Sequence, residues 1–456
     1  MSTQTHIKDF TSGNVSRQLI AFAWPLFLSN LLQVVYNMVD MIVVGNVMGK
    51  AGLSAVSVGG DLAHLLTFVA MGFSNAGQVI IAQYIGAKKR EKIGTFIGTM
   101  SSFLLLCAVV LSVAGLLGQD YLLSWMNTPA EAYSGAKSYA VISMIGLVFI
   151  YGYNTVSAVL RGMGDSKHPF IFISIAAVLN LLLDVVFVVW LRMGAGGAAL
   201  ATVISQAVSF LACVWFLYKH RREFELDIRF AAFIHWNREM LGDLVKLGVP
   251  MAIKTASIQV SKLFVNAWVN GYGVAVSAFA GVVNKIAGVA NLISMAMNAA
   301  GSTMVGQNLA AGEYGRVKKI MKDIGVITAI VAALLTLGFV LFPEEIIGWF
   351  TEKGDADVLS LARGFVPIAA LLFFGASARA IMNSLLNGSG NYKVNFATAI
   401  FDGVVMRIGL AVLFGLVLDM RHYGFWLGDA LAGFTPFFIG VVFYFSGSWK
   451  KVKSKE

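Results

Sequence analysis

The chain has 456 residues, of which 58% are hydrophobic and only 13% are charged, and its mean hydropathy is +0.76. Soluble domains carry about 25% charged residues, so this composition argues against a water-soluble enzyme and predicts that much of the apolar surface faces lipid. Lys and Arg outnumber Asp and Glu by 34 to 24, which gives a formal net charge of +10. Whether this excess indicates nucleic-acid binding depends on where the basic residues lie.

The amino-terminal segment is polar, and the apolar stretch that follows it is too long for a signal peptide and lacks a small-residue cleavage site. We therefore expect a retained first span. Eleven further apolar stretches follow, and because backbone groups in lipid must be hydrogen-bonded within their own segment, they are predicted to be transmembrane helices. The twelve predicted spans cover residues 18–44, 53–84, 94–116, 137–160, 169–191, 196–218, 244–269, 276–307, 323–342, 360–385, 394–417 and 424–446.

The basic residues are distributed unequally between the predicted loops. An even number of spans puts both termini on one side, and that side receives 22 Lys and Arg residues against five on the other. This asymmetry predicts that both termini are cytoplasmic. We expect a multi-pass protein of a prokaryotic inner or plasma membrane that contacts the lipid bilayer, binds no nucleic acid and has no obligatory protein partner.

The two halves of the chain repeat short motifs about 225 residues apart. Each half has six spans, so both copies would insert in the same orientation, related by an axis along the membrane normal. The sequence thus predicts an all-α membrane protein with two pseudo-symmetric six-helix bundles facing a central cleft. The matching segments are Trp24-Pro25 with Val249-Pro250, Ala82-Gln83 with Gly306-Gln307, and residues 160–165 with residues 386–391.

The expected organisation follows from these spans. The lobes are separated by the longest polar interruption of the chain. The predicted parts are a cytoplasmic N-terminal segment (1–17), an N-terminal six-helix lobe (18–218), a cytoplasmic linker (219–243), a C-terminal six-helix lobe (244–446) and a basic cytoplasmic tail (447–456).

Acidic and amide side chains interrupt the apolar spans of the first half. Ionisable groups at bilayer depth cost roughly 2.5–3.5 kcal/mol each, so each needs a function or a partner. On the fifth predicted span, Asn180 and Asp184 are four residues apart and share a helix face. One face of the first span carries Asn30, Gln33, Asn37 and Asp40.

Two carboxyl groups in such a setting can bind a cation. Desolvation penalises the charged form of a buried carboxyl group, and a second carboxyl group nearby adds to this penalty. Asp40 and Asp184 could therefore take up a proton or Na⁺ near neutral pH. The oxygens of Asn154 and Thr202, on the fourth and sixth spans, suit a hard cation as well as they suit a protonated acid. No other cofactor is expected, and the residues leave H⁺ and Na⁺ open as the coupling ion.

The second half is basic where the first is acidic. Lys254 and Lys262 lie in the seventh span, and Lys285 and Arg379 lie in the eighth and tenth. Asp402 and Arg407 share the eleventh span, but a spacing of five residues is poor for an ion pair on one α-helix. Cations at a cleft wall would favour an anionic or zwitterionic substrate over a cationic one. The candidate substrate-contacting residues are Asn30, Gln33, Tyr36, Asn37, Gln259, Lys262, Asn266, Lys285 and Arg379.

Across essentially its whole length, the chain resembles the multidrug and toxic compound extrusion (MATE) transporters. The segment from Tyr36 to Asp40 is similar to the first span of their DinF-like branch. The resemblance implies a cation site in the amino-terminal lobe and a bend in the first span, which makes Pro25 a candidate hinge. The NorM-like branch has acids on the seventh and tenth spans, and here neither span has one. The residues that match the family's cation site are Asp40, Asn154, Asn180, Asp184 and Thr202.

The resemblance implies a secondary active transporter that exports small amphipathic compounds by alternating access, driven by inward H⁺ or Na⁺. Two alternatives stay open because of the basic second half. One is a flippase for a lipid-linked anionic substrate, and the other is an exporter of an anionic or zwitterionic metabolite. A membrane enzyme is disfavoured, because HExxH, GxSxG and CxxC motifs are absent from the sequence.

Overall fold

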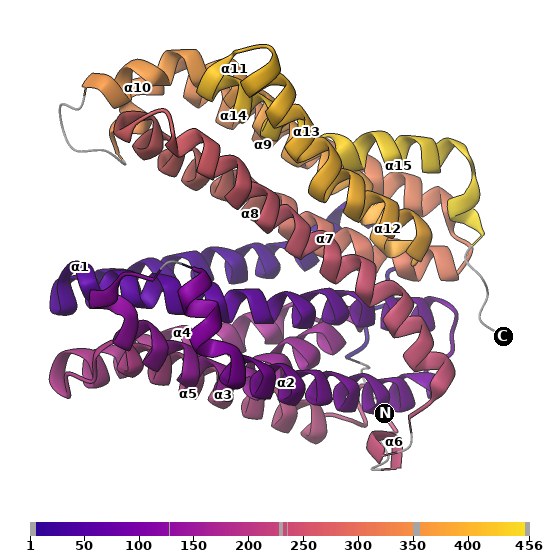
Figure 1. Ribbon diagram of the computed structural model, residues 1–456. Helices are drawn as coiled ribbons and strands as arrows, with labels where there is room; N and C mark the ends of the chain where they lie inside the picture. Colours follow the sequence, from indigo (N-terminus) through magenta and orange to yellow (C-terminus); the bar gives the residue numbers. More distant parts are fainter. Residues whose placement is uncertain (1–5, 127, 228–230, 235, 350–355, 452–456) are drawn as a thin grey trace. The chain divides into compact units, whose positions relative to one another are not determined.

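The computed structural model describes residues 6–126, 128–227, 231–234, 236–349 and 356–451. All regular secondary structure in these residues is helical (Figure 1). In chain order the helices are α1 (Val15–Gly86), α2 (Glu91–Trp125), α3 (Ala130–Gly162), α4 (Lys167–Asp184), the π-helix η1 (Val185–Trp190), α5 (Gly194–Lys219), α6 (Ala231–Ile234), α7 (Arg238–Asn270), α8 (Val274–Ala310), α9 (Tyr314–Leu341), α10 (Pro343–Gly348), α11 (Ala356–Gly388), α12 (Tyr392–Ile400), the π-helix η2 (Phe401–Val405), α13 (Met406–Val412), the π-helix η3 (Leu413–Val417), α14 (Arg421–Ala432), α15 (Thr435–Phe445) and the 3₁₀-helix η4 (Ser448–Lys450).

The number of spans agrees with the sequence prediction. Ten helical segments of the described chain are long and apolar enough to cross a membrane. One of them is α1, whose 72 residues are interrupted at Gly49, where φ is 64° and ψ is −158°, so it supplies two spans. The helix α7 is not among the ten because Lys254 and Lys262 make it more polar, but its 33 residues are long enough to span. Together these helices provide the twelve expected spans.

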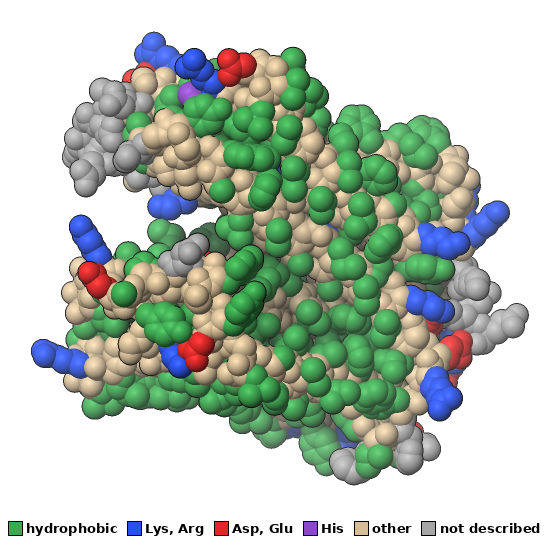
Figure 2. Space-filling model, in the orientation of Figure 1, with side chains coloured by type: hydrophobic (Ala, Val, Ile, Leu, Met, Phe, Trp, Pro, Cys, Tyr) green, Lys and Arg blue, Asp and Glu red, His purple; other side chains and the backbone are tan. Residues whose placement is uncertain are grey.

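Hydrophobic side chains are exposed along the helices, as expected for a protein in lipid. Figure 2 shows them over most of the visible face, whereas Lys, Arg, Asp and Glu gather toward the helix ends. Leu117, Trp190 and Leu263 are examples, with 84%, 73% and 70% of their surface exposed. A water-soluble protein would not expose so many large apolar side chains. The described chain is therefore a multi-pass membrane protein.

The described chain divides into two compact units. The first contains residues 1–9 and 24–252, and the second contains residues 10–23 and 253–456. In the first unit α3 packs against α2 and α5, and in the second α11 packs against α8 and α9. Each unit buries its own cluster of apolar side chains, with Phe96 and Leu147 at the centre of the first and Phe279 and Phe365 in the second.

Equivalent glycines in the two units show that the repeat extends to helix packing. A Cβ atom on Gly162 of α3 would lie 2.8 Å from the main-chain oxygen of Gln78 and 2.9 Å from Cβ of Ile81. A Cβ atom on Gly388 of α11 would lie 2.8 Å from the oxygen of Ser302 and 2.8 Å from Cβ of Val305. Both glycines belong to the motif that the sequence repeats, and each permits the same close helix approach within its own unit.

Two prolines lie where a helix passes from one unit to the other. Pro25 of α1 and Pro250 of α7 are each within two residues of the division. Proline removes one backbone hydrogen bond and clashes with the preceding turn, so it weakens a helix at its own position. One turn later, the Ser29 hydroxyl donates a hydrogen bond of 2.8 Å to the Pro25 carbonyl, a contact that often bends helices.

Candidate functional site

The two predicted acids of the first unit come together. Asp40 lies on α1, and Asp184 is the last residue of α4, directly before the π-helix η1. Their carboxyl groups are within hydrogen-bonding reach of each other. The Asp184 side chain is fully buried, and within the described part of the chain no N–H or O–H group donates to either of its oxygens.

The chemistry of two neighbouring carboxyl groups favours uptake of a proton or a metal ion. Two ionised carboxylates are acceptors only, so they repel each other unless one is protonated or a metal ion binds both. Asp40 also has one buried oxygen without a donor among the described residues. The pair therefore has the chemistry of a site that is completed by a proton or a small hard cation.

Hydroxyl and amide groups surround the acid pair. The Asn180 amide donates to the Thr202 hydroxyl across 3.4 Å, and that hydroxyl donates to the Ala198 carbonyl at 3.1 Å. Asn180 and Thr202 also line a small pocket together with Tyr36, which lies close to both acids. Four of the five predicted cation-site residues are thus neighbours. The fifth, Asn154, donates to the Ile150 carbonyl of its own helix at 2.8 Å, and no described contact joins it to the acids.

Tyr139 of α3 belongs to this group and was missed by the sequence analysis. It lies near both acids and near Thr202. Its only sequence signal is a hydroxyl group near the beginning of the fourth predicted span, which does not distinguish it from the other 12 tyrosines of the chain.

The other predicted residues of the first span lie elsewhere on α1. Gln33 and Asn37 are exposed, whereas Asn30 is partly buried. None of the three makes a described contact with the acid pair.

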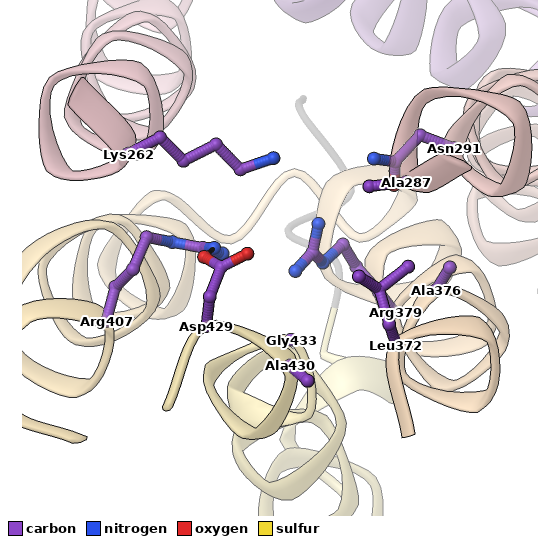
Figure 3. Close-up of a pocket in the computed structure, with 10 residues that line it drawn as sticks. All are labelled: Lys262, Ala287, Asn291, Leu372, Ala376, Arg379, Arg407, Asp429, Ala430 and Gly433. Atoms are coloured by element: carbon purple, nitrogen blue, oxygen red, sulfur yellow. Dashed lines mark hydrogen bonds and ion pairs between the residues drawn. The ribbon is translucent and has the colours of Figure 1, made fainter. Parts of the chain in front are cut away.

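The second unit contains a pocket lined by charged side chains. In Figure 3 the side chains of Lys262 of α7, Asn291 of α8 and Arg379 of α11 point toward a common space. Arg407 of α13 and Asp429 of α14 also line this space, with their charged groups next to each other. Two of the predicted substrate-contacting residues, Lys262 and Arg379, therefore share one site.

The remaining candidates of the second unit do not line this pocket. Gln259 and Lys285 are exposed, and Asn266 is partly buried. Lys254 is buried, and its Nζ donates to Oδ1 of Asn383 at 2.6 Å.

The expectation that Asp402 and Arg407 are poorly placed for each other is wrong. Nη2 of Arg407 lies 3.2 Å from Oδ1 of Asp402, and 1% and 0% of the two side chains are exposed. The cause is the π-helix η2, which runs from Phe401 to Val405. A π-helix bonds residues i and i+5, so side chains five apart lie on one face.

Asp429 is a second partner of Arg407 that the sequence analysis missed, and Nη1 of Arg407 donates to its Oδ1. The signal was present, because Asp429 is an acid inside the last predicted span.

No group of three or more His, Cys, Asp or Glu side chains in the described ranges is arranged to hold a metal ion. The acid pair of the first unit has two carboxyl groups with amide and hydroxyl oxygens near them. Such oxygen donors fit a hard cation, not a soft transition metal.

Comparison of the sequence with known proteins identifies a family. A family model described as MatE matches residues 25–186 and again residues 250–413. The two matches begin 225 residues apart, at 25 and 250, which confirms the internal duplication. The chain is similar to the probable multidrug resistance protein YpnP of Bacillus subtilis, with 28% identity over 98% of both chains. It is also similar to the probable multidrug resistance protein NorM of Thermotoga maritima, with 24% identity over 96% of this chain and 94% of that protein.

Solved structures share the fold. A crystal structure of a MATE protein in a bent conformation superposes with a TM-score of 0.87, covers 98% of each chain and is 23% identical in sequence. This likeness confirms the all-helical, two-lobed architecture that the sequence predicts.

Proposed function

This chain belongs to the MatE family of multidrug efflux transporters, and on that premise we propose that it exports small amphipathic organic compounds in exchange for inward H⁺ or Na⁺. The proposed setting is a prokaryotic inner or plasma membrane with both termini in the cytoplasm, which the basic residues of the predicted loops support. We further propose that the lobes at residues 18–218 and 244–446 enclose a central cleft that opens to alternate sides.

The observation that carries the proposal is the acid pair. Asp40 and Asp184 share a site in which the described residues provide no donor for the Asp184 oxygens. A fixed donor such as Arg or Lys would neutralise the acids permanently. Without one, the charge of the site depends on a cation that enters and leaves, which is what a coupling site requires. The proposed ligands are Asp40, Asn154, Asn180, Asp184 and Thr202, with Asp40, Asn180 and Asp184 nearest to a bound Na⁺.

Cation binding at the acid pair is proposed to change the conformation of the helices that carry the two acids. Asp40 lies on α1, fifteen residues after Pro25, and Asp184 is followed at once by the π-helix η1. A proline and a π-helix are both positions at which a helix changes direction easily. When the cation binds, the repulsion between the carboxyl groups ends and α1 can move toward α4. Pro25 is the proposed hinge of this movement.

The energy of one coupling ion is sufficient for useful export. One elementary charge crossing 100 mV releases about 2.3 kcal/mol. At about 1.4 kcal/mol per tenfold ratio, this supports a roughly fiftyfold substrate gradient. The estimate holds when the substrate itself carries no net positive charge outward.

The test uses everted membrane vesicles with H⁺ and Na⁺ gradients imposed separately. We expect one gradient to drive dye accumulation and Asp40→Asn to abolish the driven part. Asp120→Asn is the matched control, because it removes an exposed carboxyl group at the end of α2. Accumulation that persists in Asp40→Asn and after both gradients are collapsed would refute antiport.

A second candidate is supported by the basic pocket of the second unit. Lys262, Arg379 and Arg407 would disfavour a cationic drug there. Export of an anionic or zwitterionic metabolite, or movement of a lipid-linked anionic substrate across the bilayer, is the function that this pocket favours.

A further inference from the structure

The pocket of the second unit has more positive than negative charge. Lys262, Arg379 and Arg407 provide three cations, and Asp402 and Asp429 are the carboxylates near them. Both carboxylates pair with Arg407. Among the described residues, Lys262 and Arg379 form no salt bridge. Cations in a low-dielectric site are costly without counter-ions, so the pocket favours an added negative charge.

The free groups point into the same space. Nε of Arg379 is buried, and the described part of the chain offers it no hydrogen-bond acceptor. Figure 3 shows the Lys262 ammonium and the Asn291 amide directed toward each other, with the Arg379 guanidinium beside the space between them. The lining residues enclose a cavity of about 20 Å³, within a wider space of about 320 Å³ that includes open solvent.

The backbone makes room for the Arg379 guanidinium. Gly433 follows α14, and a Cβ atom there would lie 3.1 Å from Nη2 of Arg379 and 2.9 Å from the Ala430 oxygen. Any larger residue would push the guanidinium or the backbone aside. The Arg407 ion pairs fix one cation of the pocket. Lys262 and Arg379 form no salt bridge among the described residues, although Asp429 lies near both.

We propose that this pocket binds an oxyanion group, such as a phosphate, sulfonate or carboxylate, carried by the exported compound or by a lipid. A guanidinium presents parallel N–H groups that match two oxygens of such a group, and a lysine adds a point charge. The Asn291 amide supplies a further neutral donor. The role in transport rests on the proposed export function, but binding needs no ion gradient.

Binding is measured with purified full-length protein in phosphatidylcholine nanodiscs. The probes are 1-naphthyl phosphate and, as its cationic counterpart, 1-naphthylmethylammonium. We expect saturable binding of the phosphate and at least tenfold weaker binding of the ammonium compound. Arg379→Gln and Lys262→Gln should each weaken phosphate binding at least tenfold. Lys318→Gln is the matched control, since Lys318 is exposed and does not line the pocket.

Further variants keep the test decisive. Asp40→Asn should bind the phosphate as wild type does, so failure of antiport and failure of the pocket are distinguishable. If Arg379→Gln does not fold, the test rests on two variants of Lys262. Lys262→Gln should weaken phosphate binding, and the charge-retaining Lys262→Arg should bind the phosphate more tightly than Lys262→Gln does. Replacing a quarter of the lipid with phosphatidic acid identifies the source of the oxyanion. Lost phosphate binding assigns the pocket to a lipid head group, and retained binding assigns it to a soluble compound.

The proposal is overturned if 1-naphthyl phosphate shows no saturable binding in phosphatidylcholine nanodiscs. It is also overturned if folded Lys262→Gln and Arg379→Gln both bind the phosphate as tightly as wild type, or if the ammonium probe binds more tightly.

Discussion

Nη2 of Arg316, near the beginning of α9, donates a hydrogen bond of 2.8 Å to the main-chain oxygen of Phe10. The same guanidinium donates to the carbonyls of Ser12 and Gly13, and its Nε donates to Oδ1 of Asn308 at 3.0 Å. Together with Gln307, whose Oε1 accepts from the Phe10 N–H at 2.9 Å, this side chain holds residues 10–13 within the second unit.

Removing this guanidinium should release the segment. Hydrogen bonds to charged groups contribute about 1.5–3 kcal/mol each when buried, and these are partly exposed, so we expect Arg316→Ala to cost about 2 kcal/mol in total. The measurement is thermal unfolding together with protease cleavage near residue 12. Arg316→Lys keeps the positive charge but loses the several N–H donors of the guanidinium, so it should lose most of the same stability. Unchanged protease resistance in both variants would contradict this role.

Gly49 separates the first two spans, and its φ of 64° with ψ of −158° is open only to glycine. A Cβ atom there would meet nothing within 4 Å, so Gly49→Ala causes no steric clash and tests only the backbone conformation. Holding alanine in this conformation should destabilise the protein by about 1–3 kcal/mol. Gly60 is helical and also has free space around it. Gly60→Ala should therefore be neutral or stabilise by up to about 1 kcal/mol. Equal unfolding temperatures for the two variants would show that the backbone conformation at Gly49 does not require glycine.

The sequence predicts the spans, the duplication and the acid pair because these depend on signals inside single segments. Long apolar runs identify the helices, and acids are conspicuous within them, as Asp40 and Asp184 are. The Asp402–Arg407 pair was misjudged because the π-helix between them has no composition of its own. Tyr139 was missed because only tertiary packing brings it near Thr202. The assignment of residues 10–23 to the second unit also depends on tertiary contacts, including those of Arg316.

Tyr139→Phe tests the hydroxyl group beside the acid pair. The ring and its packing remain, so folding should be unaffected, while the cation site loses a polar neighbour. The hydroxyl contributes at most what a neutral hydrogen bond does, about 0.5–1.5 kcal/mol, so the half-saturating concentration of the coupling ion should change by up to roughly two- to twelvefold. The measurement is ion-driven dye transport as a function of H⁺ or Na⁺ concentration. An unchanged half-saturating concentration would remove Tyr139 from the site.

Asp120 provides a pH test outside the spans. Lys137 donates to its carboxylate at 2.7 Å and Tyr133 at 2.8 Å. These hydrogen bonds lower the pKa of Asp120 below its ordinary value of 3.8. A lowered folded-state pKa contributes stability that is present above the unfolded pKa and is lost as the pH falls through the folded pKa. Wild type and Asp120→Asn should thus differ slightly at pH 6 and converge as the pH falls from 3.8 through the folded-state pKa, as measured by thermal unfolding. A difference that grows on acidification would have the wrong sign.

Arg407 is predicted to be the most sensitive buried charge of the second unit. Arg407→Gln leaves Asp402 and Asp429 without their partner, and losing one member of a buried ion pair costs about 3–5 kcal/mol. The triple variant with Asp402→Asn and Asp429→Asn removes the uncompensated charge as well, so it should recover most of that loss. Thermal unfolding of the single and triple variants measures both effects. If the triple variant is as unstable as Arg407→Gln, the loss comes from packing around the guanidinium and not from the two abandoned carboxylates.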